Sequence, residues 1–566
     1  MLIKLFKFLL ILLFYQSPLY SKIKTLNDFN SQHLSNYFSG IIAYENNDKS
    51  QALKFFRLSK NLIQKHDPYL KFYINSLVLE RKVQKAANEI KLNLTKDNSN
   101  FFEAHLLLAL DSLKNKNYKR SKEYLEKSYE YINDDKISLI TAESLKQYLQ
   151  VFQDNKIPND RNKFGNFSLI NQTFQACFLN DENTQTYFEN LVNNKDNIKN
   201  QDDDFSRYIF FYLSFLIENN KHNEAKELVS NLDYLDSSLL ISQGKKWVED
   251  QKLAEFKKTF SCSDTDDIIA ELLFLVANLY SSQNLYEKSN FYLNISYYFN
   301  PKFEFNLSLL AENHYFNKNY TKASKILKSF NKDNEFYYWF RLKKEAQIIS
   351  KKQSKDKSLK FINLNFKKIK NPSIKTIFDI ANFNKNAKKY KEAIKYYDEM
   401  ILKIDANSQL YAEILYRRGS SYERLGDYAS SDKDLLESLE VNPDNAYVLN
   451  YLAYSWLERK YKIDLSLQML EKAYDKRRND PYIIDSIGWA YYLVNDYIKA
   501  ESFLKRAVEL MPEDPIVNDH YGDILWKLDR KIQARYFWRN VLNLEETEDV
   551  MIKNIKHKLI EGLINS

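Results

Sequence analysis

The stretch IIDSIGWAYYLVNDYIKAESFLKRAVELMPEDP (residues 483–515) decides the fold of this chain. Its apolar residues recur every three or four positions, which is the periodicity of a helix with one buried face. Small residues stand at Gly488, Ala500 and Ala507, where two helices would have to approach closely. Pro512 follows the second apolar run and cannot continue a helix. The stretch therefore predicts a helical hairpin.

The hairpin pattern repeats with a period of 34 residues. The small residues separated by this period are Gly419 and Ala453, Gly488 and Gly522, and Ala500 and Ala534. A single hairpin cannot bury its apolar stripe alone, so hairpins at a fixed period are expected to stack on one another. The sequence predicts an all-α, right-handed solenoid of stacked antiparallel helix pairs, clearest in residues 412–548.

A weaker form of the same register extends upstream. Small residues at matching positions are Gly40, Ala52, Ala86, Ser121, Ala225, Ala277, Ala311, Ala323, Ala346 and Ala393. The segment TFSCSDTDD (residues 259–267) interrupts the pattern, and Asp264 or Asp266 would suit the start of the next helix. We therefore expect a diverged N-terminal solenoid over residues 22–258 and a regular one over residues 268–548. A final capping helix is expected in residues 549–566.

The N-terminus has the build of a secretory signal peptide. Two lysines precede the apolar run FLLILLFY (residues 8–15), and a short polar tail ends at Ser21. We expect residues 1–21 to be removed and the chain to be periplasmic or secreted. Retention of residues 8–15 as an inner-membrane anchor is the alternative. The only cysteines are Cys177 and Cys262, so one disulfide can form in an oxidising compartment.

The sequence offers little that could carry chemistry. None of the eight glycines forms a G-x-G pair, which argues against a phosphate-binding loop. The seven histidines show no His-x-x-x-His spacing, so neither a metal site nor a cofactor is expected. The net charge of +8 is spread over alternating Lys and Asp or Glu residues, which does not indicate nucleic-acid binding. We expect no enzyme activity, with an unrecognised site in residues 22–258 as the alternative.

The period, the small residues and the terminal proline resemble the tetratricopeptide repeat (TPR). This resemblance implies a concave groove that binds a protein or peptide. The segments LNYLAYSWLERK, DSIGWAYYL and YGDILWKLDRKIQARYFW resemble the C-terminal half of bacterial envelope TPR adaptors, some of which serve carboxyl-terminal processing proteases that degrade peptidoglycan hydrolases. A periplasmic scaffold or adaptor is thus implied, with at most peripheral membrane contact. Those adaptors are lipoproteins, and this chain lacks their lipid-accepting cysteine. A structural assembly factor for an outer-membrane complex is the other alternative.

The resemblance also implies which residues line the groove, because TPR grooves are formed by set positions of the first helix in each pair. The candidate partner-binding residues are Tyr416, Tyr447, Asn450, Tyr454, Tyr482, Asp485, Trp489, Tyr492, Asp519, Asp523 and Trp526. Aromatic side chains often dominate binding energy, and the three aspartates would favour a basic or amide-rich segment. The alternative is that the aromatic residues only pack between repeats. Tyr416 and Ser420 replace the residues that clamp a terminal carboxylate in chaperone-binding TPR domains.

Overall fold

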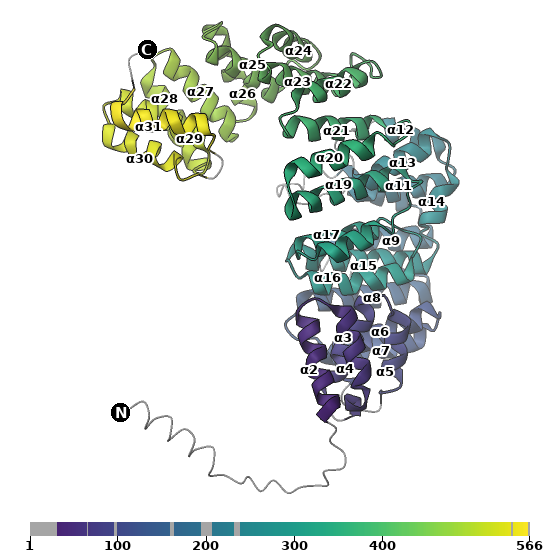
Figure 1. Cartoon of the computed structure of the whole chain (residues 1–566). Coiled ribbons are helices and arrows are strands. Elements are labelled where there is room, and N and C mark those ends of the chain that lie inside the picture. Colours follow the sequence, from purple (N-terminus) through teal and green to yellow (C-terminus); the bar gives the residue numbers. More distant parts are fainter. Residues whose placement is uncertain are drawn as a thin grey trace, which may run out of the picture. The chain divides into compact units, whose positions relative to one another are not determined.

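A computed structural model describes residues 31–64, 66–94, 99–158, 164–193, 206–230, 232, 238–544 and 547–563. Every regular element in these residues is a helix, and most helices pair with the next one along the chain in antiparallel fashion (Figure 1). The all-α prediction is thereby confirmed. Within the described ranges, no helix has the length and apolar character needed to cross a lipid bilayer. The predicted leader, residues 1–21, and the alternative anchor, residues 8–15, lie outside the described residues.

The chain divides into two compact units. The first unit contains residues 1–231 and 238–330, and the second contains residues 232–237 and 331–566. The segment of residues 259–267, where a boundary was expected, lies inside the first unit. Its helices are α2 (Ser31–Glu45), α3 (Lys49–Leu58), η2 (Lys60–Gln64), α4 (Pro68–Leu79), α5 (Val83–Lys91), α6 (Phe102–Lys114), α7 (Tyr118–Ser128), η4 (Tyr129–Tyr131), α8 (Lys136–Asp154), α9 (Asn166–Leu179), α10 (Thr184–Asn193), α11 (Ser206–Glu218), α12 (His222–Ser230), α13 (Leu239–Glu249), α14 (Ala254–Thr259), α15 (Thr265–Ser282), α16 (Tyr286–Phe299), α17 (Asn306–Phe316) and α18 (Tyr320–Leu327).

The second unit is a regular series of pairs followed by one single helix. Its helices are α19 (Glu335–Lys352), α20 (Lys355–Phe366), α21 (Ile374–Asn386), α22 (Tyr390–Ile401), α23 (Gln409–Arg424), α24 (Tyr428–Val441), α25 (Ala446–Glu458), α26 (Ile463–Lys476), α27 (Pro481–Leu493), α28 (Tyr497–Leu510), α29 (Pro515–Lys527), α30 (Lys531–Val541) and α31 (Asp549–Glu561). The pair α19–α20 corresponds to a weak repeat around Ala346, which is fully buried. The single helix α31 occupies the segment in which a capping helix was predicted.

Local sequence explains where each helix begins and how each pair turns. The first helices of three pairs are capped by Asn445, Asp480 and Asp514, whose side chains accept two backbone N–H groups each. Most turns inside the pairs contain a residue in the left-handed region, and the turn between α25 and α26 contains a second, Lys462. The other left-handed residues of these turns include Asn47, Arg81, Lys116, Asn284, Lys318, Lys388, Gly426, Lys460, Asn495 and Asp529. Most of them are Asn or Lys, which explains how a chain with eight glycines can form so many tight turns.

The predicted small residues lie where the two helices of a pair cross. A Cβ atom added to Gly488 would lie 2.7 Å from Cγ of Leu504, and one added to Gly522 would lie 2.5 Å from the ring of Trp538. The same sixteen-residue offset joins Gly419 to Leu435 and, in the first unit, Gly40 to Phe56. The remaining small positions, Ala453, Ala500, Ala507 and Ala534, are fully buried, and Pro512 follows the end of α28. One packing rule therefore applies in both units.

Replacing Ala500 with Arg should force α28 away from α27. Ala500 is fully buried in the core of the second unit, and overpacking of this kind costs about 1–3 kcal/mol or more. The loss should appear as a lower thermal midpoint and faster hydrogen exchange in residues 481–510. Ile498 on the same helix is 75% exposed, so Ile498→Arg is the matched control and should change neither quantity. Equal behaviour of the two variants would show that the assigned register is incorrect.

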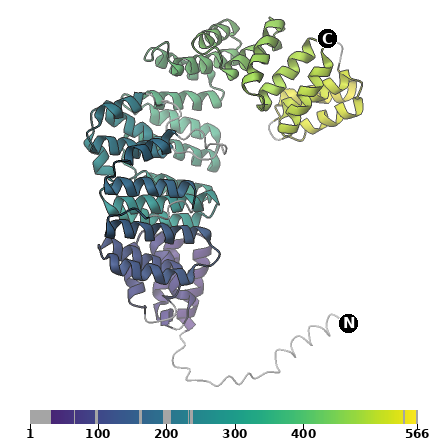
Figure 2. The same ribbon diagram turned by 180° about the vertical axis from the view of Figure 1, so that it is seen from behind.

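In the first unit, later helices pack on much earlier ones. Helix α16 packs on α4 and α5, and α15 packs on α8. In Figures 1 and 2, the teal helices of this region lie directly against the blue and purple N-terminal helices. Ion pairs connect these remote segments: Glu287 bonds Lys49 at 2.5 Å, and Lys288 bonds Asp135 at 2.7 Å. Helices α15–α18 therefore form one body with the N-terminal pairs, although residues 268–330 were expected to start the regular array.

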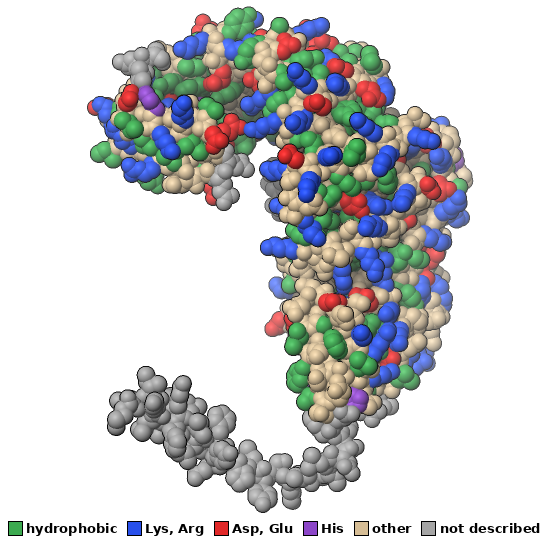
Figure 3. Space-filling view, in the orientation of Figure 1, with side chains coloured by type: hydrophobic (Ala, Val, Ile, Leu, Met, Phe, Trp, Pro, Cys, Tyr) green, Lys and Arg blue, Asp and Glu red, His purple; other side chains and the backbone are tan. Residues whose placement is uncertain are grey.

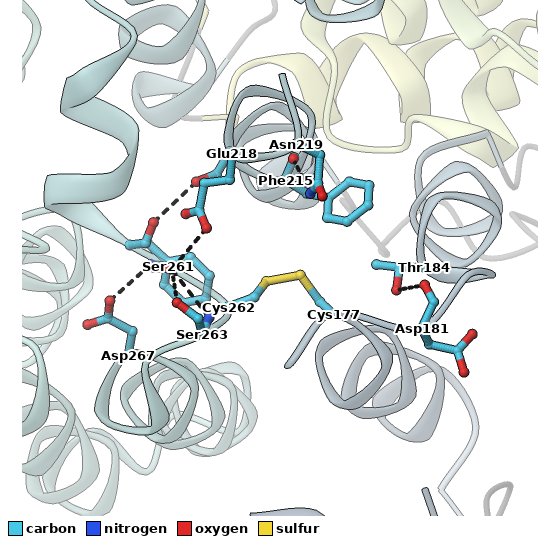
Figure 4. The surroundings of a disulfide bond; sticks show 12 residues. Cys177, Asp181, Thr184, Phe215, Glu218, Asn219, Ser261, Cys262, Ser263 and Asp267 are labelled. Atoms are coloured by element: carbon cyan, nitrogen blue, oxygen red, sulfur yellow. Dashed lines mark hydrogen bonds between the residues drawn. A yellow bond between two sulfur atoms is a disulfide. The ribbon is translucent and has the colours of Figure 1, made fainter. Parts of the chain in front are cut away.

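A disulfide between Cys177 and Cys262 joins α9 to the segment between α14 and α15 (Figure 4). Its Cα atoms are 5.7 Å apart, within the normal range. Beside it, the Ser261 hydroxyl donates to Glu218 at 3.0 Å, and the Ser261 backbone N–H donates to Asp267 at 3.0 Å. Asp264 caps α15 by accepting the backbone N–H of Asp266, as one of the two alternatives predicted. The link holds 85 residues of chain in one loop.

The first unit should be less stable at alkaline pH than at weakly acidic pH because of Asp267. Burial raises the pKa of Asp267 to about 7, and the charges of Asp264 and Asp266 raise it further. The hydrogen bond from the Ser261 backbone and the charge of Lys302 act in the opposite direction. A raised carboxyl pKa gives stability that is complete below the unfolded pKa near 4 and is lost as pH rises through about 7. Asp267→Asn keeps an acceptor for Ser261 and should raise stability at pH 8 by on the order of 2 kcal/mol, after a discount for solvent screening. Thermal unfolding of both proteins at pH 5 and pH 8 measures it; an equal difference at both pH values would contradict it.

Candidate functional site

The candidate partner-binding residues lie on four helices, each the first helix of its pair: α23, α25, α27 and α29. The matching caps Asn445 and Asp480 start α25 and α27 in the same way, so Tyr447 and Tyr482 take equivalent places in the first turn. Tyr447 is 45% exposed and Tyr482 is 61% exposed. These two rings, on the neighbouring first helices α25 and α27, are therefore accessible to a partner.

An aromatic cluster connects α25, α27 and α29. The Trp489 ring stacks on His520, with centroids 4.1 Å apart, and on Tyr492, with centroids 4.6 Å apart. The Tyr454 ring also contacts His520, with centroids 6.4 Å apart. Trp489, Tyr454 and Tyr492 are each half-buried, so each ring contributes both to packing between repeats and to the surface. The two readings of these aromatic residues, packing and binding, are compatible at this place.

Asp485 does not face solvent. It is 5% exposed, and its carboxylate lies 2.9 Å from Nδ1 of the buried His520. Burial on its own would lower the pKa of His520, but the charge and hydrogen bond of Asp485, followed by Asp519 and Asp523, raise it above its ordinary value. Asp485 and His520 thus act as a charge-assisted link between α27 and α29.

Asp519 and Asp523 are paired with a lysine from the last helix. Lys558 of α31 lies 2.6 Å from Asp519 and 2.7 Å from Asp523, and Asp523 also accepts from Trp538 at 2.9 Å. Burial, followed by the charge of Asp519, raises the pKa of Asp523, while Lys558 opposes the rise. The backbone of Gly562 lies against Trp526, because a Cβ atom there would meet its ring. The end of α31 therefore covers this part of the surface.

The expected preference for a basic segment is not supported by these charges. All three aspartates already have a partner within the chain: Lys558 contacts both Asp519 and Asp523, and His520 contacts Asp485. Neither His520 nor Lys558 was among the candidate residues. The sequence spacing could have identified both. His520 stands 35 residues after Asp485, and Lys558 stands 35 residues after Asp523, which is about one repeat.

The upstream end of the same helices is cationic. Lys385 of α21 donates to the Ser420 hydroxyl at 2.6 Å, and burial, followed by Arg417, lowers the pKa of Lys385 to about 8. Arg417 is held by Glu413 at 2.6 Å. Lys385 and Arg417 each lie 5.9 Å from the centroid of the Tyr416 ring, which packs edge-on against Tyr451. Surface charge elsewhere is mixed, since Lys and Arg side chains are interspersed with Asp and Glu in Figure 3.

One polar candidate has an unused hydrogen-bonding atom. Asn450 of α25 is half-buried, and its Oδ1 has no hydrogen-bond partner among the described residues. It lies one helical turn before Tyr454 in the sequence. This oxygen is itself buried, and a buried acceptor without a donor costs free energy, so Asn450 weakens the packing here and offers no open acceptor to a partner.

The family comparison matches the tetratricopeptide repeat to residues 412–445, which form α23 and α24. This part of the chain therefore matches a tetratricopeptide repeat, a unit that typically binds other proteins. Among the described residues, no group of three or more His, Cys, Asp or Glu side chains is arranged to hold a metal ion.

The chain is similar to several particular proteins over part of its length. It is 32% identical over 110 residues to the TPR repeat-containing protein PA4667 of Pseudomonas aeruginosa, which covers 19% of this chain and 18% of that protein. Among solved structures, MamA from Desulfovibrio magneticus is 23% identical, with a TM-score of 0.26 over 31% of this chain and 97% of that one. Pseudomonas aeruginosa PilF is 14% identical, with a TM-score of 0.28 over 33% of this chain and 86% of that one. The match to PA4667 spans under a fifth of that protein's length.

Proposed function

We propose that the protein is an exported TPR scaffold of the cell envelope that holds a segment of another protein across α23, α25 and α27. The observation that carries this proposal is the row of aromatic side chains on consecutive first helices. Tyr447 and Tyr482 are exposed, and Tyr454, Trp489 and Tyr492 are half-buried beside them. Rings of this kind supply large contact area at a low entropy cost.

The charges and polar atoms of this face define the kind of segment it would accept. Lys385 lies at the α21–α23 end and has no carboxylate partner among the described residues, whereas Arg417 is paired with Glu413 and the aspartates at the α29 end are paired too. An extended segment with apolar side chains opposite Trp489 and an acidic residue toward Lys385 fits this distribution.

The disulfide supports the proposed compartment. Disulfides persist in oxidising environments such as the bacterial periplasm and are rare in the cytosol. The bond between Cys177 and Cys262 therefore agrees with the leader expected in residues 1–21. Within the envelope, recruitment of a processing protease or a peptidoglycan hydrolase is the narrower role that the resemblance to envelope adaptors suggests.

The double substitution Tyr454→Ala with Trp489→Ala tests the binding face. Both rings lie in the aromatic cluster, so their removal should weaken capture of the partner at least tenfold, which is about 1.4 kcal/mol. The tagged full chain would be cross-linked in native cells, and the proteins recovered would be identified and then titrated in purified form.

The matched control removes two tyrosines from second helices. Tyr428 on α24 is 41% exposed and Tyr536 on α30 is 67% exposed, and neither belongs to the aromatic cluster. Tyr428→Ala with Tyr536→Ala should leave capture unchanged. A folded Tyr454/Trp489 variant that still captures every partner would place binding elsewhere. The identity of a partner lost only in that variant would also decide between a protease, a cell-wall enzyme and an assembly complex.

A further inference from the structure

The first unit contains a pocket of about 320 Å³ at the end of α4, beside α16, α17 and α18. This volume lies in the range typical of small-ligand sites. Its apolar wall is formed by Leu79, Leu310 and Ile326, and its polar lining is formed by Glu80, Arg81, Asn294, His314, Lys322, Lys325 and Ser329. None of these residues belongs to the binding face of the second unit.

The lining of the pocket is cationic. Lys322 bonds Glu80 at 3.1 Å, which compensates one charge. Within the described ranges, neither Arg81 nor Lys325 has an ion-pair partner, although both line the same space. Three cations and one carboxylate leave two uncompensated positive charges facing the pocket.

Arg81 is held in place by the backbone and by a ring. It is the left-handed residue of the turn between α4 and α5, with a φ of 58°. Its guanidinium lies over the Tyr297 ring of α16, 5.1 Å from the centroid. Burial lowers the pKa of Arg81 below its ordinary value, while Tyr297 and Glu80 act in the opposite direction. The guanidinium is thus oriented without a carboxylate partner of its own.

His314 reports the positive potential of the pocket. Burial, followed by the charges of Lys322, Arg81 and Lys49, lowers the pKa of His314 to about 3. The imidazole is therefore neutral at physiological pH and can donate or accept one hydrogen bond without adding charge. Asn294 is buried beside it, and its Oδ1 has no hydrogen-bond partner in the described part of the chain.

We propose that this pocket binds a small dianion, either a phosphate monoester or a dicarboxylate. A guanidinium fork and two ammonium groups match the oxygens of both ligand classes, and charge-assisted hydrogen bonds are the strong ones. Two uncompensated cations match a charge of minus two. Occupancy would tie the α4–α5 turn to α17 and α18, which are remote in sequence.

Calorimetric titration of the full chain at constant ionic strength tests the proposal, with glycerol phosphate and succinate as the probes and chloride as the background anion. Arg81→Asn removes the guanidinium and suits the left-handed conformation at this position, and Lys325→Gln removes an ammonium group. Each should weaken binding at least tenfold, about 1.4 kcal/mol. Lys328→Gln is the control, because Lys328 is exposed at the end of α18 and does not line the pocket.

The proposal is supported if either probe binds, if both pocket variants lose this binding, and if Lys328→Gln keeps it. The probe that binds more tightly shows whether the ligand is a phosphate monoester or a dicarboxylate. Absence of heat with both probes at millimolar concentration would overturn it. Equal weakening in Lys328→Gln would also overturn it, since that indicates non-specific attraction. An acidic peptide that binds where neither probe does would show that the site takes a protein segment instead. Circular dichroism of each variant confirms folding.

Discussion

Replacing Glu271 with Gln should destabilise the first unit by about 3–5 kcal/mol, because it leaves a buried guanidinium without its counter-charge. Glu271 of α15 is 1% exposed, and Arg207 of α11 reaches it with two hydrogen bonds, at 2.8 Å and 2.6 Å. Native-state hydrogen exchange measures the loss as faster opening of α11 and α15.

The surroundings of Arg207 explain why the loss should be so large. The guanidinium lies among the rings of Phe211, Phe274, Phe303 and Phe305, with the Phe274 centroid at 3.8 Å. Among the described residues, one acceptor besides Glu271 reaches it, Asn306 at 3.0 Å. Water cannot easily replace a carboxylate at this place, so the unpaired charge keeps most of its desolvation cost.

Two controls separate this effect from the loss of any ion pair. Glu255 and Lys258 also approach to 2.6 Å, but Lys258 is 68% exposed, so Glu255→Gln should cost about 0–1 kcal/mol. The double variant Arg207→Met with Glu271→Met removes both charges and fills the space with apolar atoms, so it should recover most of the stability. A Glu271→Gln variant as stable as Glu255→Gln would show that Arg207 is solvated in solution.

The regular part of the fold could be predicted because its rules are local and repeated. Helix pairing follows from apolar periodicity, and the crossing points follow from small residues at a fixed offset, as with Gly488 against Leu504. The left-handed turn residues recur at nearly the same period, at Lys460, Asn495 and Asp529. Such features depend only on residues within one repeat or its neighbour, so they can be predicted from a single sequence.

The packing of α15 and α16 on much earlier helices could not be predicted in this way. It depends on pairs such as Lys49 with Glu287, whose residues are more than two hundred positions apart and have no periodic relation. The candidate surface shows the same limit on a smaller scale. Repeat register placed Asp485 and Asp523 on the correct helices, but it did not show that His520 and Lys558 compensate them.

Removal of the disulfide should also have a large effect, about 2–5 kcal/mol on the first unit. The bond between Cys177 and Cys262 closes a loop of 85 residues that contains α10–α14, and cross-links over long loops restrict the unfolded chain most. Cys177→Ser with Cys262→Ser is the clean variant, since a single substitution would leave one reactive thiol. Denaturant unfolding of the first unit, followed by hydrogen exchange in α9 and α15, measures the change.

The same bond gives a direct test of the compartment, because the chain has only these two cysteines. Protein taken from its native host and treated with an alkylating reagent before reduction should carry no label if it matures in an oxidising compartment. Protein produced in a reducing cytosol should carry two labels and should unfold like the double serine variant. Two labels on the native material would contradict export, because two free thiols indicate that the chain matured in a reducing compartment. No label, together with an N-terminus that begins after Ser21, would establish that the scaffold works outside the cytosol.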